Sequence, residues 1–274
     1  MLRGISGNLG EKAADTFADD QHKDLKADFI MANPPFNQKD WRAENELVDD
    51  ARWRGYDVPP KSNANYGWIL NMVSKLSENG VAGFILANGA LSGGGEEYKI
   101  RRKLIENNLV EAILVLPQDM FYTTNISVTL WIVNKNKKAQ SKKVGEETRQ
   151  YRDREKEILF MDLRQIGEPF EKKFIQFGED AVKKVVSTYH QWQYKEIENI
   201  PEFCYAASFE EVAKKDFSLV PSKYIEFVNR DENIDFDEKM QTLKSEFADL
   251  LKAEAESKND LLSVFKELGY EIKL

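Results

Sequence analysis

The tetrapeptide Asn33-Pro34-Pro35-Phe36 combines residue types that suit methylation of an amino group on a flat ring. The Asn33 side-chain carbonyl and the Pro34 backbone carbonyl are two acceptors, and Pro35 restricts the backbone before it and so fixes the Pro34 carbonyl. Two acceptors aimed at the hydrogens of an exocyclic amino group favour a more tetrahedral nitrogen, in line with a methyl sulfonium. Phe36 offers a flat face to a base rotated out of a duplex. These residues predict a base pocket.

The position of the tetrapeptide supports this prediction. Residues 28–32 form a short apolar run, which predicts a buried strand that ends at the prolines. Ligands of open α/β sheets lie outside the carboxyl ends of the strands. The alternative is a plain strand-ending turn, for which Asn-Pro is common. The strand before it and the aromatic residue after it favour the pocket.

The single cysteine, Cys204, narrows the possible chemistry. Methylation of a ring carbon in cytosine needs a cysteine nucleophile, but Cys204 lies between Phe203 and Tyr205, far from any predicted strand-end turn. We predict that it is a core residue. One cysteine also excludes a disulfide framework within the chain and a cysteine-rich metal site, and we predict no metal.

The formal net charge of −8 bears on nucleic-acid binding. A protein that holds DNA alone usually has a basic surface, because phosphate neutralisation supplies most of the non-specific affinity. Three interpretations stay open: a local DNA contact, a partner that supplies most of the contact, or no contact with nucleic acid. Candidate DNA contacts are the lysines after the predicted strand at 127–133, although a basic loop is more often only solvated. These lysines are Lys135, Lys137, Lys138, Lys142 and Lys143.

Regular elements that alternate along the chain must position the tetrapeptide. Further strands are predicted at 81–87, 109–116, 127–133 and 158–163, and helices at 66–76, 96–107, 180–192 and 209–215. Ser208 is a plausible N-cap of the last helix. Residues 1–26 and 38–64 read as loops, and 145–157 as an exposed charged segment. The alternation predicts an α/β fold, with a parallel sheet and helices on both faces.

The C-terminal segment has a different pattern. Apolar residues from Phe236 to Leu250 follow a 4, 3, 4, 3 spacing, which is that of a coiled-coil seam, and the frame resumes at Leu261. The helix could pack on a partner or on its own domain, and the sequence favours neither. We expect a domain over residues 1–225 and a helical tail over 226–274. No run is apolar and long enough to cross a membrane, and no secretory signal precedes the domain, so a cytoplasmic protein is expected.

Several stretches, with the tetrapeptide among them, resemble one known family. They are residues 15–17, 20–22, 26–29, 33–37, 87–95, 100–102, 109–113, 116–117, 121, 131–135 and 217–224. The family is the modification subunit of type I restriction-modification systems, an N6-adenine DNA methyltransferase. The resemblance implies a Rossmann-like class I methyltransferase fold, S-adenosyl-L-methionine as methyl donor, and DNA as substrate. It also implies assembly with a specificity subunit and a restriction subunit, with the C-terminal helices packed on the specificity subunit.

The resemblance implies site residues as well. Asn33, Pro34, Pro35 and Phe36 become the catalytic residues. Asp15 and Phe17, together with Asn33, become contacts of the methyl donor.

One feature of the family is missing. Its glycine-rich cofactor motif follows a strand well upstream of the Asn-Pro-Pro-Phe motif, whereas Gly4, Gly7 and Gly10 follow no predicted strand. Residues 93–95 are three glycines that open a helix, and we interpret them as a tight turn rather than a phosphate cradle. We therefore expect a sheet incomplete at its N-terminal half, as in a truncated or split gene or a fragment, with a separate chain as one source of that half, and no turnover by this chain alone. The alternatives are an inactive remnant that only binds subunits, or an amino-methyltransferase of RNA or protein.

Overall fold

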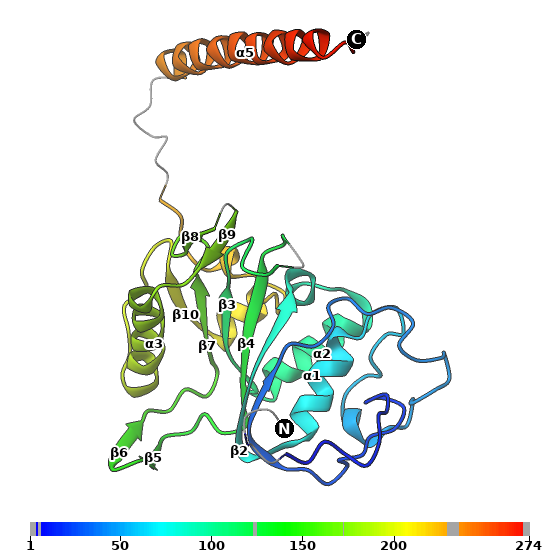
Figure 1. Cartoon of the computed structure of the whole chain (residues 1–274). Coiled ribbons are helices and arrows are strands. Elements are labelled where there is room, and N and C mark those ends of the chain that lie inside the picture. Colours follow the sequence, from blue (N-terminus) through cyan, green and yellow to red (C-terminus); the bar gives the residue numbers. More distant parts are fainter. Residues whose placement is uncertain (1–3, 5–6, 123–124, 172, 229–235, 271–274) are drawn as a thin grey trace. The chain divides into compact units, whose positions relative to one another are not determined.

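The structure is a computed structural model that describes residues 4, 7–122, 125–171, 173–228 and 236–270. The chain divides into two compact units, residues 1–227 and 228–274, which we describe separately (Figure 1).

A six-stranded sheet forms the centre of the first unit, in the order β1-β2-β4-β3-β7-β10. Its strands are β1 (Ala27–Ala32), β2 (Leu76–Ala87), β3 (Val110–Val115), β4 (Val128–Asn134), β7 (Glu157–Asp162) and β10 (Cys204–Ser208). Two small hairpins lie outside it, β5 (Gln140–Val144) with β6 (Glu147–Tyr151), and β8 (Glu168–Phe170) with β9 (Phe174–Gln176).

The sheet is mixed, so the prediction of a parallel sheet is wrong in part. β1 pairs with β2 in parallel and β3 with β7 in parallel, but β4 is antiparallel to both β2 and β3. β10 is antiparallel to β7. The described residues between β3 and β4 form no crossover helix, and antiparallel neighbours need none. Because β1, β2, β3 and β7 still run in one direction, their carboxyl ends share one edge of the sheet.

Helices cover both faces of this sheet, as predicted (Figure 1). They are α1 (Asn65–Ser74), α2 (Gly95–Glu106), α3 (Glu179–Tyr194) and α4 (Phe209–Lys214), with 3-10 turns η1 (Ala51–Trp53), η2 (Asn88–Leu91) and η3 (Pro221–Lys223). Side chains of β3 alternate between two buried clusters, with Ile113 packed toward α1, α2 and α4, and Leu114 packed toward Trp192 of α3. The period of two in the strand therefore builds one core on each face.

β1 corrects a second prediction, because it is not a buried strand. It is the edge strand of the described sheet, and the side chains of Phe29 and Met31 are 73% and 93% exposed. Ile30, on the opposite face, packs against the cluster beneath α1. An apolar run of this length does not reveal whether one face is left uncovered.

The second unit contains the helix α5 (Phe236–Glu267), in which no residue is buried. The apolar seam predicted from the sequence lies along it, and Phe247, Leu250 and Leu261 are each more than half exposed. Among the helices of the described residues, none combines the length and the apolarity that a membrane crossing requires.

Candidate active site

Residues 33–36, here called the Asn33 turn, leave the sheet directly after β1, at the edge shared by the carboxyl ends of the co-directional strands. Asn33 and Pro35 are exposed, whereas Pro34 is buried. Phe36 is half-buried against the cluster that contains Leu116 and Val128. The turn is thus anchored through Pro34 and Phe36 and presents Asn33 to solvent, which is the arrangement that a base acceptor needs.

The start of α1 holds the two residues that come directly after this turn. The backbone N–H of Asn37 donates to Oδ1 of Asn65 at 3.0 Å, and Nδ2 of Asn65 donates back to Oδ1 of Asn37 at 2.9 Å. At the next position, the Gln38 carbonyl accepts from the backbone N–H of Ala64 at 2.9 Å, and the Gln38 side chain accepts from Nε1 of Trp68 at 3.4 Å. No pattern in the sequence indicated these partners.

Asp15 shapes the other predicted segment. Its Oδ1 accepts from the backbone N–H groups of Phe17 at 2.7 Å and Ala18 at 3.1 Å, and the residue is exposed. The ring of Phe17 is only 2% exposed and packs between Trp41 and Trp68, with ring centroids 4.4 and 4.3 Å away. Phe17 therefore anchors the segment in the core.

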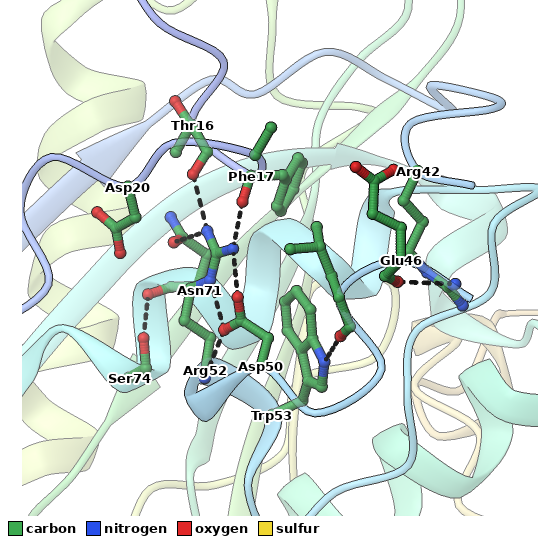
Figure 2. A network of polar contacts seen from close by, with 12 residues as sticks. Thr16, Phe17, Asp20, Arg42, Glu46, Asp50, Arg52, Trp53, Asn71 and Ser74 are labelled. Atoms are coloured by element: carbon green, nitrogen blue, oxygen red, sulfur yellow. Dashed lines mark hydrogen bonds and ion pairs between the residues drawn. The ribbon is translucent and has the colours of Figure 1, made fainter. Parts of the chain in front are cut away.

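Arg52, in the long loop between β1 and α1, forms hydrogen bonds with the same segment at residues 15–17 (Figure 2). Its Nη1 donates to the Thr16 carbonyl at 2.8 Å and its Nη2 to the Phe17 carbonyl at 2.5 Å, while Nε and Nη2 bond the Asp50 carboxylate, each at 2.8 Å. Burial alone would raise the pKa of Asp50, but the hydrogen bonds and charge of Arg52 hold it below its ordinary value. Asp50 therefore stays ionised and keeps the guanidinium in place.

Trp68 of α1 connects the segment at residues 15–17 with the residues that follow the Asn33 turn. Its ring packs on Phe17, and its Nε1 donates to the Gln38 side chain. The structure thus attaches both segments to the first turn of one helix. The helical spacing predicted this helix correctly but did not identify it as the common support.

The three glycines at 93–95 connect η2 to α2: Gly94 is the N-cap of α2 with an extended backbone, and Gly95 is the first residue of the helix. The Gly93 carbonyl accepts from Nη1 of Arg101 at 2.7 Å, and Gly95 has φ +59°. A Cβ on Gly93 would lie 1.9 Å from Oε2 of Glu97, whose pKa is raised by burial. The atom that would clash is the end of a flexible side chain, so this contact alone does not require glycine at position 93.

The predicted DNA-contacting lysines do not behave alike. Lys137 is 2% exposed, and its Nζ donates to the carbonyls of Val110 at 3.0 Å and Glu157 at 2.8 Å. Burial lowers its pKa to about 8. A DNA contact through Lys137 is therefore wrong, whereas for the exposed Lys135, Lys138, Lys142 and Lys143 it stays a prediction.

Cys204 is 1% exposed in β10, and burial raises the pKa of its thiol. Its assignment to the core is confirmed. A buried, protonated thiol is a poor nucleophile, which agrees with an amino group rather than a ring carbon as the acceptor.

Comparisons with known proteins agree with this geometry. The model of the N-6 DNA methylase family matches residues 1–233. The type I restriction enzyme HindI methylase subunit of Haemophilus influenzae is 39% identical over 98% of this chain and 58% of its own length. The MjaIX methylase subunit of Methanocaldococcus jannaschii is 32% identical over 98% of this chain and 47% of its own. The chain thus spans about half the length of these relatives.

Solved structures show the same fold. The methyltransferase subunit of a type I restriction-modification system from Streptococcus thermophilus superposes with a TM-score of 0.66 at 26% identity, over 78% of this chain and 42% of that one. The EcoKI M protein gives a TM-score of 0.55 at 17% identity, over 79% of this chain and 47% of that one. The sheet is therefore that of class I methyltransferases, and the chain belongs to the N-6 DNA methylase family, with type I restriction enzyme methylase subunits among its relatives.

Proposed function

We propose that this chain is the base-binding part of an adenine-specific DNA methyltransferase of a type I restriction-modification system, with S-adenosyl-L-methionine as methyl donor. The observation that carries the proposal is the Asn33 turn, which presents an exposed amide at the carboxyl edge of the sheet from a buried anchor. Family membership supports the class of reaction. Adenine, the donor and the partner subunits are part of the proposal.

The turn acts by orientation. Oδ1 of Asn33 and the Pro34 carbonyl accept the two hydrogens of the adenine amino group and direct its lone pair at the methyl group. Phe36 supports the base that has left the duplex. The donor would supply an electrophilic methyl group on a sulfonium, and its sulfur would leave as a neutral thioether when the S–CH3 bond breaks. The methylated nitrogen would be acidic and would lose its extra proton to water, so no strong base is required.

The described residues offer contacts for only one side of a methyl-donor site, at Asp15 and Asn33. Asp15 is exposed and its Oδ1 is committed to backbone N–H groups, so Oδ2 is the oxygen that we assign to the donor. Phe17 would support Asp15 from the core, since its ring is packed between tryptophans. Asn33 would lie beside the transferred methyl group.

We propose that a further polypeptide segment, joined to this chain or separate, completes the donor site next to β1. Phe29 and Met31 leave an apolar face at the open edge of the sheet, and edges of this kind pair readily with another strand. The greater length of the relatives supports this proposal. This chain alone should bind the donor weakly and not turn over. Calorimetry with S-adenosyl-L-methionine tests it, and micromolar binding by the isolated chain contradicts it.

The decisive experiment measures methyl transfer from labelled donor in a complex that contains the specificity subunit and the cofactor-binding segment. Label should enter adenine in unmodified DNA and should not enter RNA or protein. Asn33→Ala should lower the rate by at least about 100-fold, the order of magnitude for a lost transition-state contact, without loss of assembly. Asn79→Ala is the matched control. Asn79 is exposed near the amino end of β2, whereas the Asn33 turn lies at the edge formed by the carboxyl ends of the strands. Normal activity of Asn33→Ala refutes the base pocket.

A second candidate is a remnant that only binds subunits. The exposed apolar seam of α5 favours a binding role for the tail, which we assign to the specificity subunit; a restriction subunit would join through that assembly. A complex that assembles fully but transfers no label, even with the cofactor-binding segment present, would support this alternative.

A further inference from the structure

The Asn33 turn needs a fixed support, because a misplacement of about 1 Å can cost about 100-fold in rate. Upstream, the turn follows β1, whose paired neighbour among the described residues is β2. Its two prolines contribute no backbone N–H that could fasten the turn. Pro34 and Phe36 anchor the turn by burial, and the hydrogen bonds that restrain it come from the residues directly after Phe36.

Asn37 is where the chain turns back. Its φ is +50°, in the left-handed region, where asparagine is among the few side chains that are tolerated. In this conformation both its backbone N–H and its side-chain Oδ1 meet the amide of Asn65, at 3.0 and 2.9 Å. Nδ2 of Asn63 donates a second hydrogen bond to the same Oδ1 at 3.2 Å, which is the third bond of Asn37 with these two residues.

Asn65 is a rigid anchor for this contact. It is 1% exposed and is the first residue of α1. The nearby residues Tyr66, Ile69 and Leu70 of the same helix are fully buried in the core. A buried amide with both polar atoms satisfied has one orientation, so the position of the helix is transmitted to the turn.

We propose that Asn65 is a positioning residue for methyl transfer: through its reciprocal amide pair with Asn37, it holds the Asn33 turn in the conformation that presents both acceptors to the amino group. The proposal rests on the proposed function, since it assigns the support of that same turn. Asn65 acts through Asn37 and does not touch the base.

The test uses the reconstituted complex, with labelled S-adenosyl-L-methionine and unmodified DNA. Asn65→Ala and Asn37→Gly should each lower kcat by about 10- to 100-fold while the KM for DNA changes by less than about threefold. Asn37→Asp keeps the backbone N–H and an acceptor oxygen, so it should retain kcat within about threefold of the wild type. Both changes break the bond between Nδ2 of Asn65 and Oδ1 of Asn37, so the double variant should lose less than the product of the two single losses.

A control for general destabilisation comes from the other end of α1. Val73 is buried, belongs to the same helix and is remote in sequence from the turn. Val73→Ala should lower the thermal midpoint at least as far as Asn65→Ala and leave kcat unchanged. Assays are run well below both midpoints, and assembly is checked by size-exclusion chromatography.

Three outcomes overturn the proposal. The first is a kcat of Asn65→Ala within twofold of the wild type while Asn33→Ala is inactive. This outcome rejects the positioning role of Asn65 and leaves the proposed function in place. The second is an equal loss of kcat in Val73→Ala, which reduces the effect to stability. The third is normal activity of Asn33→Ala, which removes the proposed function and this inference with it.

Discussion

Lys137 lies in a basic stretch of the sequence, yet its ammonium group is in the core, bonded to the Val110 and Glu157 carbonyls. Lys137→Met removes these donors and leaves buried acceptors without them, which costs about 1–3 kcal/mol for each group. The free energy of unfolding should therefore fall by about 2 kcal/mol or more in urea titrations. Lys138→Met, at the exposed neighbouring position, should change it by less than about 0.5 kcal/mol. Equal effects of the two substitutions would contradict the buried role.

The same lysine makes stability depend on pH in a stated direction. Its pKa is about 8 in the folded chain, against an ordinary value of 10.5. Below about pH 8 both states carry the proton, so this group gives no slope. Between the two values the unfolded chain binds more protons, so the free energy of unfolding rises with pH. The wild type should gain stability relative to Lys137→Met across this window, and a constant difference would contradict the lowered pKa.

Residue types alone point to the Asn33 turn because its four residues are contiguous and a chemical role can be proposed for each. Its supports are not contiguous. Asn65 meets Asn37 from 28 positions away, and Arg52 meets Phe17 from 35 positions away. A pattern with helical or strand period carries no information on such pairs, so Arg52, Asn65 and Trp68 could not be predicted.

At the scale of elements, the start of α4 was predicted from Ser208 and the structure confirms it. Oγ of Ser208 accepts from the Glu211 backbone N–H at 3.2 Å, and Oε2 of Glu211 accepts from the Ser208 backbone N–H at 2.8 Å. Ser208→Ala should cost about 1 kcal/mol and Ser208→Gly only a few tenths, measured by chemical denaturation. Ser141→Ala, at an exposed site in β5, is the control and should be close to neutral.

Other elements show where local patterns fail. The run at 127–133 predicts a strand correctly, but its direction depends on the connection before it rather than on its own residues. The hairpin of β5 and β6 is built mostly from polar and charged residues, and the sequence predicts no strand there, because its side chains are largely exposed and no apolar alternation marks it. The position of β1 at the edge of the sheet is set by which strands lie beside it, and a local sequence pattern does not show that.

This chain is acidic and exposes apolar surface at β1 and along α5, and we expect its proposed DNA contact to depend on assembly with a partner. A net charge of −8 opposes non-specific binding to phosphates. If a partner subunit carries the surface that recognises DNA, this chain can be acidic and still be part of a complex that binds DNA. The isolated chain should therefore bind duplex DNA weakly at physiological salt, and the complex with the specificity subunit should bind tightly. Gel-shift titrations at two salt concentrations compare them, and tight binding by the isolated chain would contradict this division of roles.

The seam of α5 offers the sharpest test of that assembly. Phe247 lies on the seam and is 62% exposed, while Ala248, also exposed, is off the seam by one position. If the seam packs on the specificity subunit, Phe247→Glu removes a buried ring and buries a charge, which should cost at least about 3 kcal/mol, or over 100-fold in Kd. Ala248→Glu adds the same charge on the solvent side and should leave the Kd of assembly within about threefold of the wild type.

Light scattering after size exclusion measures the complex, and both variants should keep the thermal transition of residues 1–227, since each change lies in the second unit. Intact assembly of Phe247→Glu would show that the tail packs elsewhere.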